Sequence, residues 1–308
     1  MRETMEILAD FPVRKTKKQK QAFRTAVMAY AEKLGYTTME ETGNFGSRNV
    51  VIGDPEKACY LITAHYDTCA RMLIPNFITP CNAFVFYLTK FAVWFFLILM
   101  GSVAGALAGL LLGERWVSLF SALLVLGFVA LMLLGPANRN NVNDNTSGVI
   151  TLLEIVRALP ENQRKKVCFV LFDLEEAGLI GSSSYRKTHM AATDRQLVLN
   201  LDCVGDGDHI LMIPTKQLKK DRKKLASLYK ACGYFGKKSL LVKDKGFAIY
   251  PSDQRCFPYG VGICALNKGK CGLYLSRIHT RKDTVLDQTN VNILRAALIS
   301  YISCTAVN

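Results

Sequence analysis

The sequence predicts an α/β fold: a mixed, mostly parallel sheet with helices on both faces, plus an inserted transmembrane helical hairpin. Three observations lead to this prediction. Short apolar runs suited to buried strands alternate with segments of helical periodicity. Polar residues follow several of these runs directly, and two long runs without charge interrupt the first half of the chain. We therefore expect one domain built from residues 1–80 and 137–308, with the hairpin at 81–136.

The expected elements follow one another along the chain in the order of an α/β sheet. Residues 16–34 place apolar side chains on one face of a helix. The run 167–172 is apolar throughout, as in a strand buried on both faces. The full series is helix 16–34, strands 49–52 and 60–64, polar loop 138–147, helix 149–159, strand 167–172, helix 178–188, strands 197–201, 261–266 and 273–278, and helix 290–303.

The two charge-free runs are residues 91–112 and 116–134. Each is long enough to cross about 30 Å of hydrocarbon as a helix. Only Gly113, Glu114 and Arg115 separate them, so we expect a tight hairpin in the lipid bilayer, with spans at about 84–112 and 116–135. The alternative is a pair of buried core helices, although the core helix of a soluble protein rarely lacks a polar face.

Glycine recurs at every fourth position of the first span, at residues 101, 105, 109 and 113. Such a row leaves a groove where another helix can approach closely. The nearest expected partner is the second span, where Ser118, Ala122 and Ala130 are small. The other is a second copy of the chain, in a homodimer formed through the glycine row.

Charge and cysteine usage predict where the domain lies. Arg71, Lys90 and Arg139 flank the spans on the domain side, against Arg115 alone in the connecting loop, which favours a two-pass protein of the cell membrane with a cytoplasmic domain. The ten cysteines form no regular framework, which favours a reducing compartment. The first residues lack the apolar core of a signal peptide.

The net charge is +14, but no nucleic-acid motif accompanies the lysine-rich stretches 15–20 and 216–224, so we expect no nucleic-acid partner.

The candidate chemical residues follow the predicted strands. In an open α/β sheet, ligands bind beyond the carboxyl ends of the strands. Clustered buried carboxylates repel one another unless cations compensate them, and zinc accepts a mixture of carboxylate oxygen and imidazole nitrogen. The candidates are His65 after 60–64, Glu175 and Glu176 after 167–172, Asp202 after 197–201, His279 after 273–278, and Asp144 in the polar loop before a helix.

Six ordered stretches make the sequence similar to metallopeptidase family 28, the co-catalytic zinc aminopeptidases and their relatives, among them glutamate carboxypeptidases and glutaminyl cyclases. They are AHYDT (64–68), NDNTSG (143–148), FDLEEAGLIGS (172–182), LNLDCVG (199–205), PSDQRCF (251–257) and HTRKDT (279–284). The resemblance implies a zinc exopeptidase fold of the phosphorylase/hydrolase type, two Zn²⁺ per chain and a peptide substrate, with an aminopeptidase as the simplest case.

The resemblance also implies a role for each matching position. Asp144 bridges the two metals, Glu176 and His279 complete one site, and His65 and Asp202 complete the other. Glu175 is the general base, and Asp67 accepts the second imidazole N–H of His65. Asp283 is an outer partner near His279 or a plain turn residue. His189 and His209 match no motif and are expected at the surface or in packing.

Two departures from the family pattern lie in the loop that carries Asp144 and in the stretch that lines the family's substrate pocket. Asn143 stands where the family has an acidic residue, and Ser252-Asp253-Gln254 replaces the family's SDH, which puts substrate preference in doubt. The spacing of Tyr250 does not fit a role at the oxyanion. Two other functions remain open: a glutaminyl cyclase-like acyltransferase, whose relatives use one zinc, and a catalytically silent membrane receptor or scaffold. The retained Glu175 argues against the silent protein.

Overall fold

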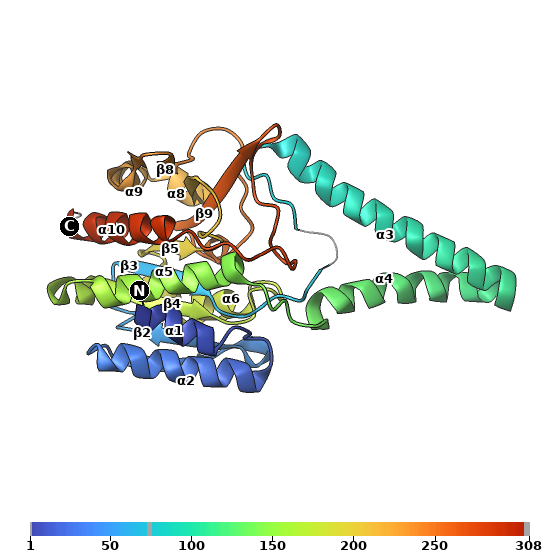
Figure 1. The fold of residues 1–308 in the computed structure, drawn as a ribbon, viewed down its shortest axis with the longest axis horizontal. Helices are drawn as coiled ribbons and strands as arrows, with labels where there is room; N and C mark the ends of the chain where they lie inside the picture. The colour runs from blue at the N-terminus through green and yellow to red at the C-terminus, as the bar shows by residue number, and fades with distance from the viewer. Residues whose placement is uncertain (1, 73–75, 305–308) are drawn as a thin grey trace.

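A computed structural model describes residues 2–72 and 76–304. It is a layered α/β domain from one end of which a long two-helix hairpin projects (Figure 1). The expected α/β fold with a mixed sheet and helices on both faces is confirmed. Both apolar runs of the hairpin are helical.

The sheet has ten strands in the order β1-β2-β4-β3-β5-β9-β6-β8-β7, with β10 paired to β9. The central neighbours β4, β3, β5 and β9 are parallel, so their carboxyl ends meet at one edge. The strands are β1 (Thr38–Thr42), β2 (Arg48–Ile52), β3 (Tyr60–His65), β4 (Val167–Phe172), β5 (Leu197–Leu201), β6 (His209–Pro214), β7 (Gly233–Phe235), β8 (Lys238–Val242), β9 (Gly260–Gly269) and β10 (Gly272–Tyr274).

Alternating side chains of the central strands build a core on each face of the sheet. On β4, Phe169 and Leu171 join the larger core, while Cys168, Val170 and Phe172 join the smaller one. The larger core is covered by α1, α2, α5 and α10, and the smaller one by α6. The helices of the domain are α1 (Arg2–Asp10), α2 (Lys17–Lys33), α5 (Gly148–Ala158), α6 (Ile180–Thr188), α7 (Met190–Thr193), α8 (Lys216–Lys220), α9 (Arg222–Leu228) and α10 (Gln288–Cys304).

One expected strand is wrong. Of the run 273–278, only Leu273 and Tyr274 lie in a strand, β10, which pairs antiparallel with the end of β9. The remaining residues form a loop held to the segment before the hairpin by an isolated bridge between Ile78 and Leu275. Their apolar side chains, among them those of Leu275 and Ile278, pack in a local buried cluster. Because they are buried there, the run has the apolar composition of a buried strand.

The hairpin consists of α3 (Ala83–Leu112), the turn η2 (Glu114–Trp116) and α4 (Val117–Leu134). Gly101, Gly105 and Gly109 of the glycine row face α4, the nearer of the two expected partners, while a Cβ at Gly113 would meet nothing within 4 Å. A Cβ atom at Gly105 would lie 2.1 Å from Ser121 Oγ and 2.7 Å from the carbonyl of Val117, so the helices approach this closely only with glycine. The contacts fall on Val117, Ser121 and Val125, not on the small residues expected. A homodimer through the row stays a prediction.

The hairpin helices are not core helices of the domain. α4 has no buried residue, and α3 has few, among them Gly101 and Gly105, which lie against α4. Both are long and apolar enough to cross a membrane.

Candidate active site

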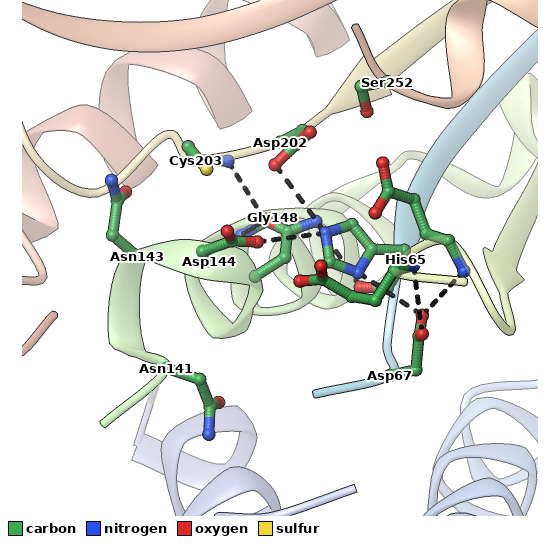
Figure 2. Close-up of polar contacts among 12 residues, drawn as sticks. His65, Asp67, Asn141, Asn143, Asp144, Gly148, Asp202, Cys203 and Ser252 are labelled. Carbon is green, nitrogen blue, oxygen red and sulfur yellow. Dashed lines mark hydrogen bonds and ion pairs between the residues drawn. The ribbon is translucent and has the colours of Figure 1, made fainter. Parts of the chain in front are cut away.

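Four of the predicted site residues lie close together at the carboxyl edge of the sheet: His65, Asp67, Asp144 and Asp202 (Figure 2). His65, the last residue of β3, is buried, and its Nε2 lies 3.2 Å from Asp144 Oδ1 and 3.7 Å from Asp202 Oδ1. Asp202 follows β5, and Asp144 comes from the irregular turn η3 (Val142–Ser147) before α5. Three residues far apart in the sequence thus present their ligand atoms to one point.

A second group gathers on the other side of Asp144. His279 Nε2 lies 3.0 Å from Asp144 Oδ2 and 3.4 Å from Glu176 Oε2. His279 does not follow a strand, as the sequence predicted, but lies in a loop with the left-handed backbone φ of 63°. The buried Cys69 adds a thiol to this group, because its ligand atom lies within 4.8 Å of those of Glu176 and His279.

These separations are compatible with a zinc ion bound among the ligand atoms. Two ligands on one tetrahedral zinc at about 2.0–2.1 Å lie about 3.3 Å apart. The four measured separations run from 3.0 to 3.7 Å and so bracket this value. Glu176 Oε1 and Asp202 Oδ1 are buried without a hydrogen-bond partner among the described residues. Unpaired buried carboxylate oxygens are costly, and a cation among them would remove that cost.

Asp67 positions two parts of the site. Its Oδ1 lies 3.5 Å from His65 Nδ1, an ion-pair distance without hydrogen-bond geometry. Its two oxygens also accept the backbone N–H groups of Glu175 at 3.1 Å and Glu176 at 3.3 Å. The expected contact between Asp67 and His65 is therefore present as an ion pair but not as a hydrogen bond. The hold on the turn that carries Glu175 and Glu176 was not predicted.

Asp283 is the partner of Asp144 rather than of His279. It accepts the backbone N–H of Asn143 at 2.7 Å and that of Asp144 at 3.1 Å. Burial raises its pKa to about 7, and the nearby Asp144 adds to this. Asn143 itself accepts the backbone N–H of Gly205 at 2.7 Å through its amide oxygen, so the asparagine serves as a structural bridge. Both contacts fix the direction in which Asp144 points.

Asn145 and Gly148 also hold in place the loop that carries Asp144. The sequence analysis did not predict a role for either residue. The Asn145 amide donates to the carbonyl of Leu201 at 2.9 Å and accepts the N–H of Cys203 at 3.2 Å, which joins the loop to the end of β5. A Cβ atom at Gly148 would lie 2.4 Å from the carbonyl of Leu201, so only glycine allows α5 to start this close to β5.

The electrostatics of the cluster favour a bound cation. Burial raises the pKa of Glu176 to about 8, although His279 opposes the shift. For His279 burial lowers the pKa, but Glu176 and Asp144 raise it more, to about 9. Burial alone would also raise the pKa of Asp144, yet hydrogen bonds to His279 and His65 hold it below its ordinary value. The carboxylates therefore draw positive charge to this point.

A cavity of about 270 Å³ opens beside the cluster and is lined by Asp144, Glu175, Glu176, Asp202 and His279. Tyr250, which the sequence did not place in the site, also lines it, and its hydroxyl donates to the backbone carbonyl of Asp202 at 3.2 Å. Asp253 is fully buried, and burial raises its pKa to about 7. His189 and His209 lie outside the site: His189 bonds Glu41 and Glu56, and His209 lies beside Ser239, as expected for packing histidines.

With this geometry established, the comparison with known proteins decides the family. The sequence model of peptidase family M28 matches residues 132–301. The chain belongs to peptidase family M28. The resemblance drawn from the six motifs is therefore confirmed at the level of the family. A probable leucine aminopeptidase 2 from Aspergillus oryzae is 38% identical over 76 residues, which are 23% of this chain and 15% of that protein.

Several solved structures have a similar fold, and the similarity covers nearly the whole of this M28 chain. A Zn-dependent exopeptidase from Parabacteroides distasonis is 16% identical, with a TM-score of 0.62 over 98% of this chain and 96% of that one. A leucine aminopeptidase precursor from Bacteroides thetaiotaomicron is 17% identical, with 0.61 over 98% and 95%. A glutaminyl cyclase from Porphyromonas gingivalis is 17% identical, with 0.61 over 97% and 95%. At such identities the likeness establishes the fold and leaves the activity open.

Proposed function

We propose that this M28 protein is a di-zinc peptidase, in the simplest case an aminopeptidase, anchored in the membrane by its hairpin. One observation carries the proposal: the two oxygens of Asp144 face different histidines, His65 at 3.2 Å and His279 at 3.0 Å. A single bridging carboxylate between two ligand groups suits a pair of metal ions. His65 and Asp202 would hold one ion, and Glu176 and His279 the other, so that the chain takes two Zn²⁺.

The chemistry divides between the ions and the chain. Bound zinc supplies Lewis acidity, which lowers the pKa of water and polarises the substrate carbonyl. Glu175 lines the same cavity, takes a proton from the attacking water and delivers it to the leaving amine as the C–N bond breaks. Burial raises the pKa of the Glu175 carboxyl well above the ordinary value, and the neighbouring Glu176, Asp253 and Asp202 add to this. The carboxylate of Asp67 accepts the backbone N–H of Glu175 and so keeps Glu175 in place.

Glutaminyl cyclase chemistry is the second candidate because proteins with that activity share the fold. The family resemblance implies that such cyclases use one zinc and lose part of the second site, whereas Asp144, Glu176 and His279 are all present here. A silent receptor is disfavoured because Glu175 lines the cavity. Purified protein should contain two zinc ions per chain and hydrolyse aminoacyl reporters. One zinc per chain, with cyclisation of N-terminal glutamine and no hydrolysis, would favour the cyclase, and no turnover of either kind would favour the receptor.

The hairpin is proposed to cross the membrane with the catalytic domain in the cytoplasm. Its support is the exposed apolar surface of both helices and the cations at their domain ends, where Lys90 donates to Asn76 and Lys15 to the carbonyl of Leu133. An impermeant thiol reagent applied to intact cells should leave the exposed Cys304 unlabelled and should label a Glu114→Cys variant at the hairpin tip. Labelling of Cys304 instead would place the domain outside.

A further inference from the structure

The two groups of candidate metal ligands differ in their chemistry. The first group consists of His65, Asp144 and Asp202. The second contains Glu176 and His279 together with the thiol of Cys69, whose sulfur lies within 4.8 Å of the ligand atoms of both. Cys69 is only 1% exposed and forms no disulfide. Within residues 2–72 and 76–304, a thiol thus enters the second group and not the first.

Hydrogen bonds hold the backbone of Cys69 beside the loop that carries His279. The carbonyl of Cys69 accepts the N–H of Asn138 at 2.9 Å, and the side chain of Asn138 donates to the carbonyl of Thr280 at 3.0 Å. Three residues after the cysteine, the N–H of Met72 donates to the carbonyl of His279 at 2.7 Å. The segment that carries the thiol is therefore fixed relative to the loop that carries the imidazole.

The Cys69 thiol lacks a hydrogen-bond partner among the described residues. By contrast, the thiols of Cys168 and Cys232 donate to backbone carbonyls at 3.9 Å and 3.8 Å. In the same group as Cys69, Glu176 Oε1 is buried and likewise has no hydrogen-bond partner in the described part of the chain. Buried polar atoms without partners are costly. Two such atoms in one group indicate a cation as their common partner.

The number and the spacing of the ligand atoms suit a four-coordinate ion. Asp144 Oδ2, Glu176 Oε2 and His279 Nε2 supply three ligand atoms, so a tetrahedral zinc has one position left. With bonds of about 2.3 Å to sulfur and about 2.0–2.1 Å to nitrogen or oxygen, a sulfur ligand lies about 3.6 Å from the other ligand atoms. Since the Cys69 sulfur is within 4.8 Å of two of these residues' ligand atoms, it reaches that position by a shift of about 1.2 Å at most.

We propose that Cys69, as a thiolate, is the fourth ligand of the zinc ion held by Asp144, Glu176 and His279. The proposal rests on the di-zinc site proposed above and adds a ligand to it. When the ion binds, the S–H bond breaks, a Zn–S bond forms and the proton leaves to the solvent. Because thiolate is a soft ligand, this position selects zinc over magnesium or manganese.

The added ligand makes the two metal positions unequal. Four protein ligands close the position at His279, as in structural zinc sites, whereas the three at His65 leave one coordination place open, as in catalytic zinc sites. Glu175 reaches this side of the site, since its ligand atom lies within 4.8 Å of that of His65. The open place for water is therefore expected beside His65, and the closed position serves to hold Asp144.

X-ray absorption at the zinc edge tests the proposal on the wild-type chain. The full-length protein, purified in detergent and loaded with zinc, should show one sulfur ligand for every two ions, at about 2.3 Å. The cobalt-substituted protein should show a sulfur-to-cobalt charge-transfer band in the near ultraviolet. Two bound ions without a sulfur ligand would overturn the proposal and leave the di-zinc peptidase intact. A chain that binds no zinc and hydrolyses no aminoacyl reporter would overturn both.

A pair of cysteine variants identifies the sulfur. Cys203 is the matched control, because it is also buried and lines the catalytic cavity but belongs to none of the metal-ligand groups among the described residues. Cys69→Ala should abolish the charge-transfer band and weaken the binding of one of the two zinc ions at least about 10-fold, since even outer partners of metal ligands contribute that much. Cys203→Ala should change neither the band nor the affinity. An unchanged band and affinity in Cys69→Ala would overturn the proposal, and if that variant does not fold, the sulfur count of the wild-type chain decides.

Discussion

Replacement of Glu175 by glutamine tests the proposed mechanism most directly. The amide keeps the size of the side chain, and the backbone N–H of residue 175 keeps its bond to Asp67 at 3.1 Å, so the turn should persist. None of the four short ligand-to-ligand separations involves Glu175, so the zinc content should stay at two per chain. The loss of a general base costs about 100- to 10,000-fold in turnover, which corresponds to about 2.7–5.4 kcal/mol of transition-state stabilisation.

Stability supplies an independent readout for the same variant. The carboxyl of Glu175 is buried beside Glu176, Asp253 and Asp202, all of which raise its pKa together with burial. A neutral amide removes this repulsion, so the metal-free Glu175→Gln variant should melt at the same temperature as the wild type or higher. The exposed Glu161 offers a matched control, Glu161→Gln, which should alter neither activity nor melting.

The assay combines steady-state hydrolysis of an aminoacyl reporter with metal analysis of the same sample. A Glu175→Gln variant with full activity would refute the assignment of the base. Loss of activity in proportion to loss of zinc would refute it as well, because the residue would then act as a ligand. Normal zinc with a collapse in kcat is the result that the geometry predicts.

Three further perturbations test other parts of the structure. Asp144→Asn should lower the zinc content below one per chain, because this carboxylate serves both ligand groups, and retention of two ions would contradict the bridge. Hydrogen bonds to its two glutamate partners raise the pKa of His189, so its stabilisation is complete below pH 6.5 and is lost as pH rises through the raised value. His189→Asn should accordingly lower the free energy of unfolding by about 1–2 kcal/mol at pH 6 and much less at pH 9, and equal losses would exclude the charged pair. Gly105→Leu with Gly109→Leu should lower the melting temperature by overpacking the hairpin, whereas Gly127→Leu, where nothing lies within 4 Å, should not.

Strands buried on both faces could be predicted closely from the sequence. The runs 167–172 and 197–201 are strands with the expected bounds, since an unbroken apolar run of that length suits the centre of a parallel sheet. The polar edge strand β1, with the sequence TMEET, gave no such signal, because its place is fixed by pairing with β2 rather than by burial. The run 273–278 misled because its apolar residues pack against the segment before α3, a contact that no local pattern reports.

The proximity of the candidate residues could be predicted, but the hydrogen bonds that hold them in place could not. His65, Asp144 and Asp202 are brought together as expected, because parallel strands deliver their carboxyl ends to one edge. The role of Asp283 depends on two backbone N–H groups some 140 residues away in the sequence. Such long-range hydrogen bonds leave no periodicity behind, and they appear only once the fold has brought the loops into contact.

The position of the hairpin in the chain connects it to the candidate site. The chain leaves for α3 after His65 and returns from α4 before Asp144, so the hairpin is inserted between two ligand-bearing segments. On the way out, the backbone N–H of Met72 donates to the carbonyl of His279 at 2.7 Å, and on the way back Asn138 donates to the carbonyls of Cys69 at 2.9 Å and Thr280 at 3.0 Å. The segment that leads to α3 and the segment that follows α4 are therefore both hydrogen-bonded to the loop that carries His279. If the hairpin crosses a bilayer as proposed, a tilt of the hairpin would act on that loop first, because His279 lies outside the strands of the sheet.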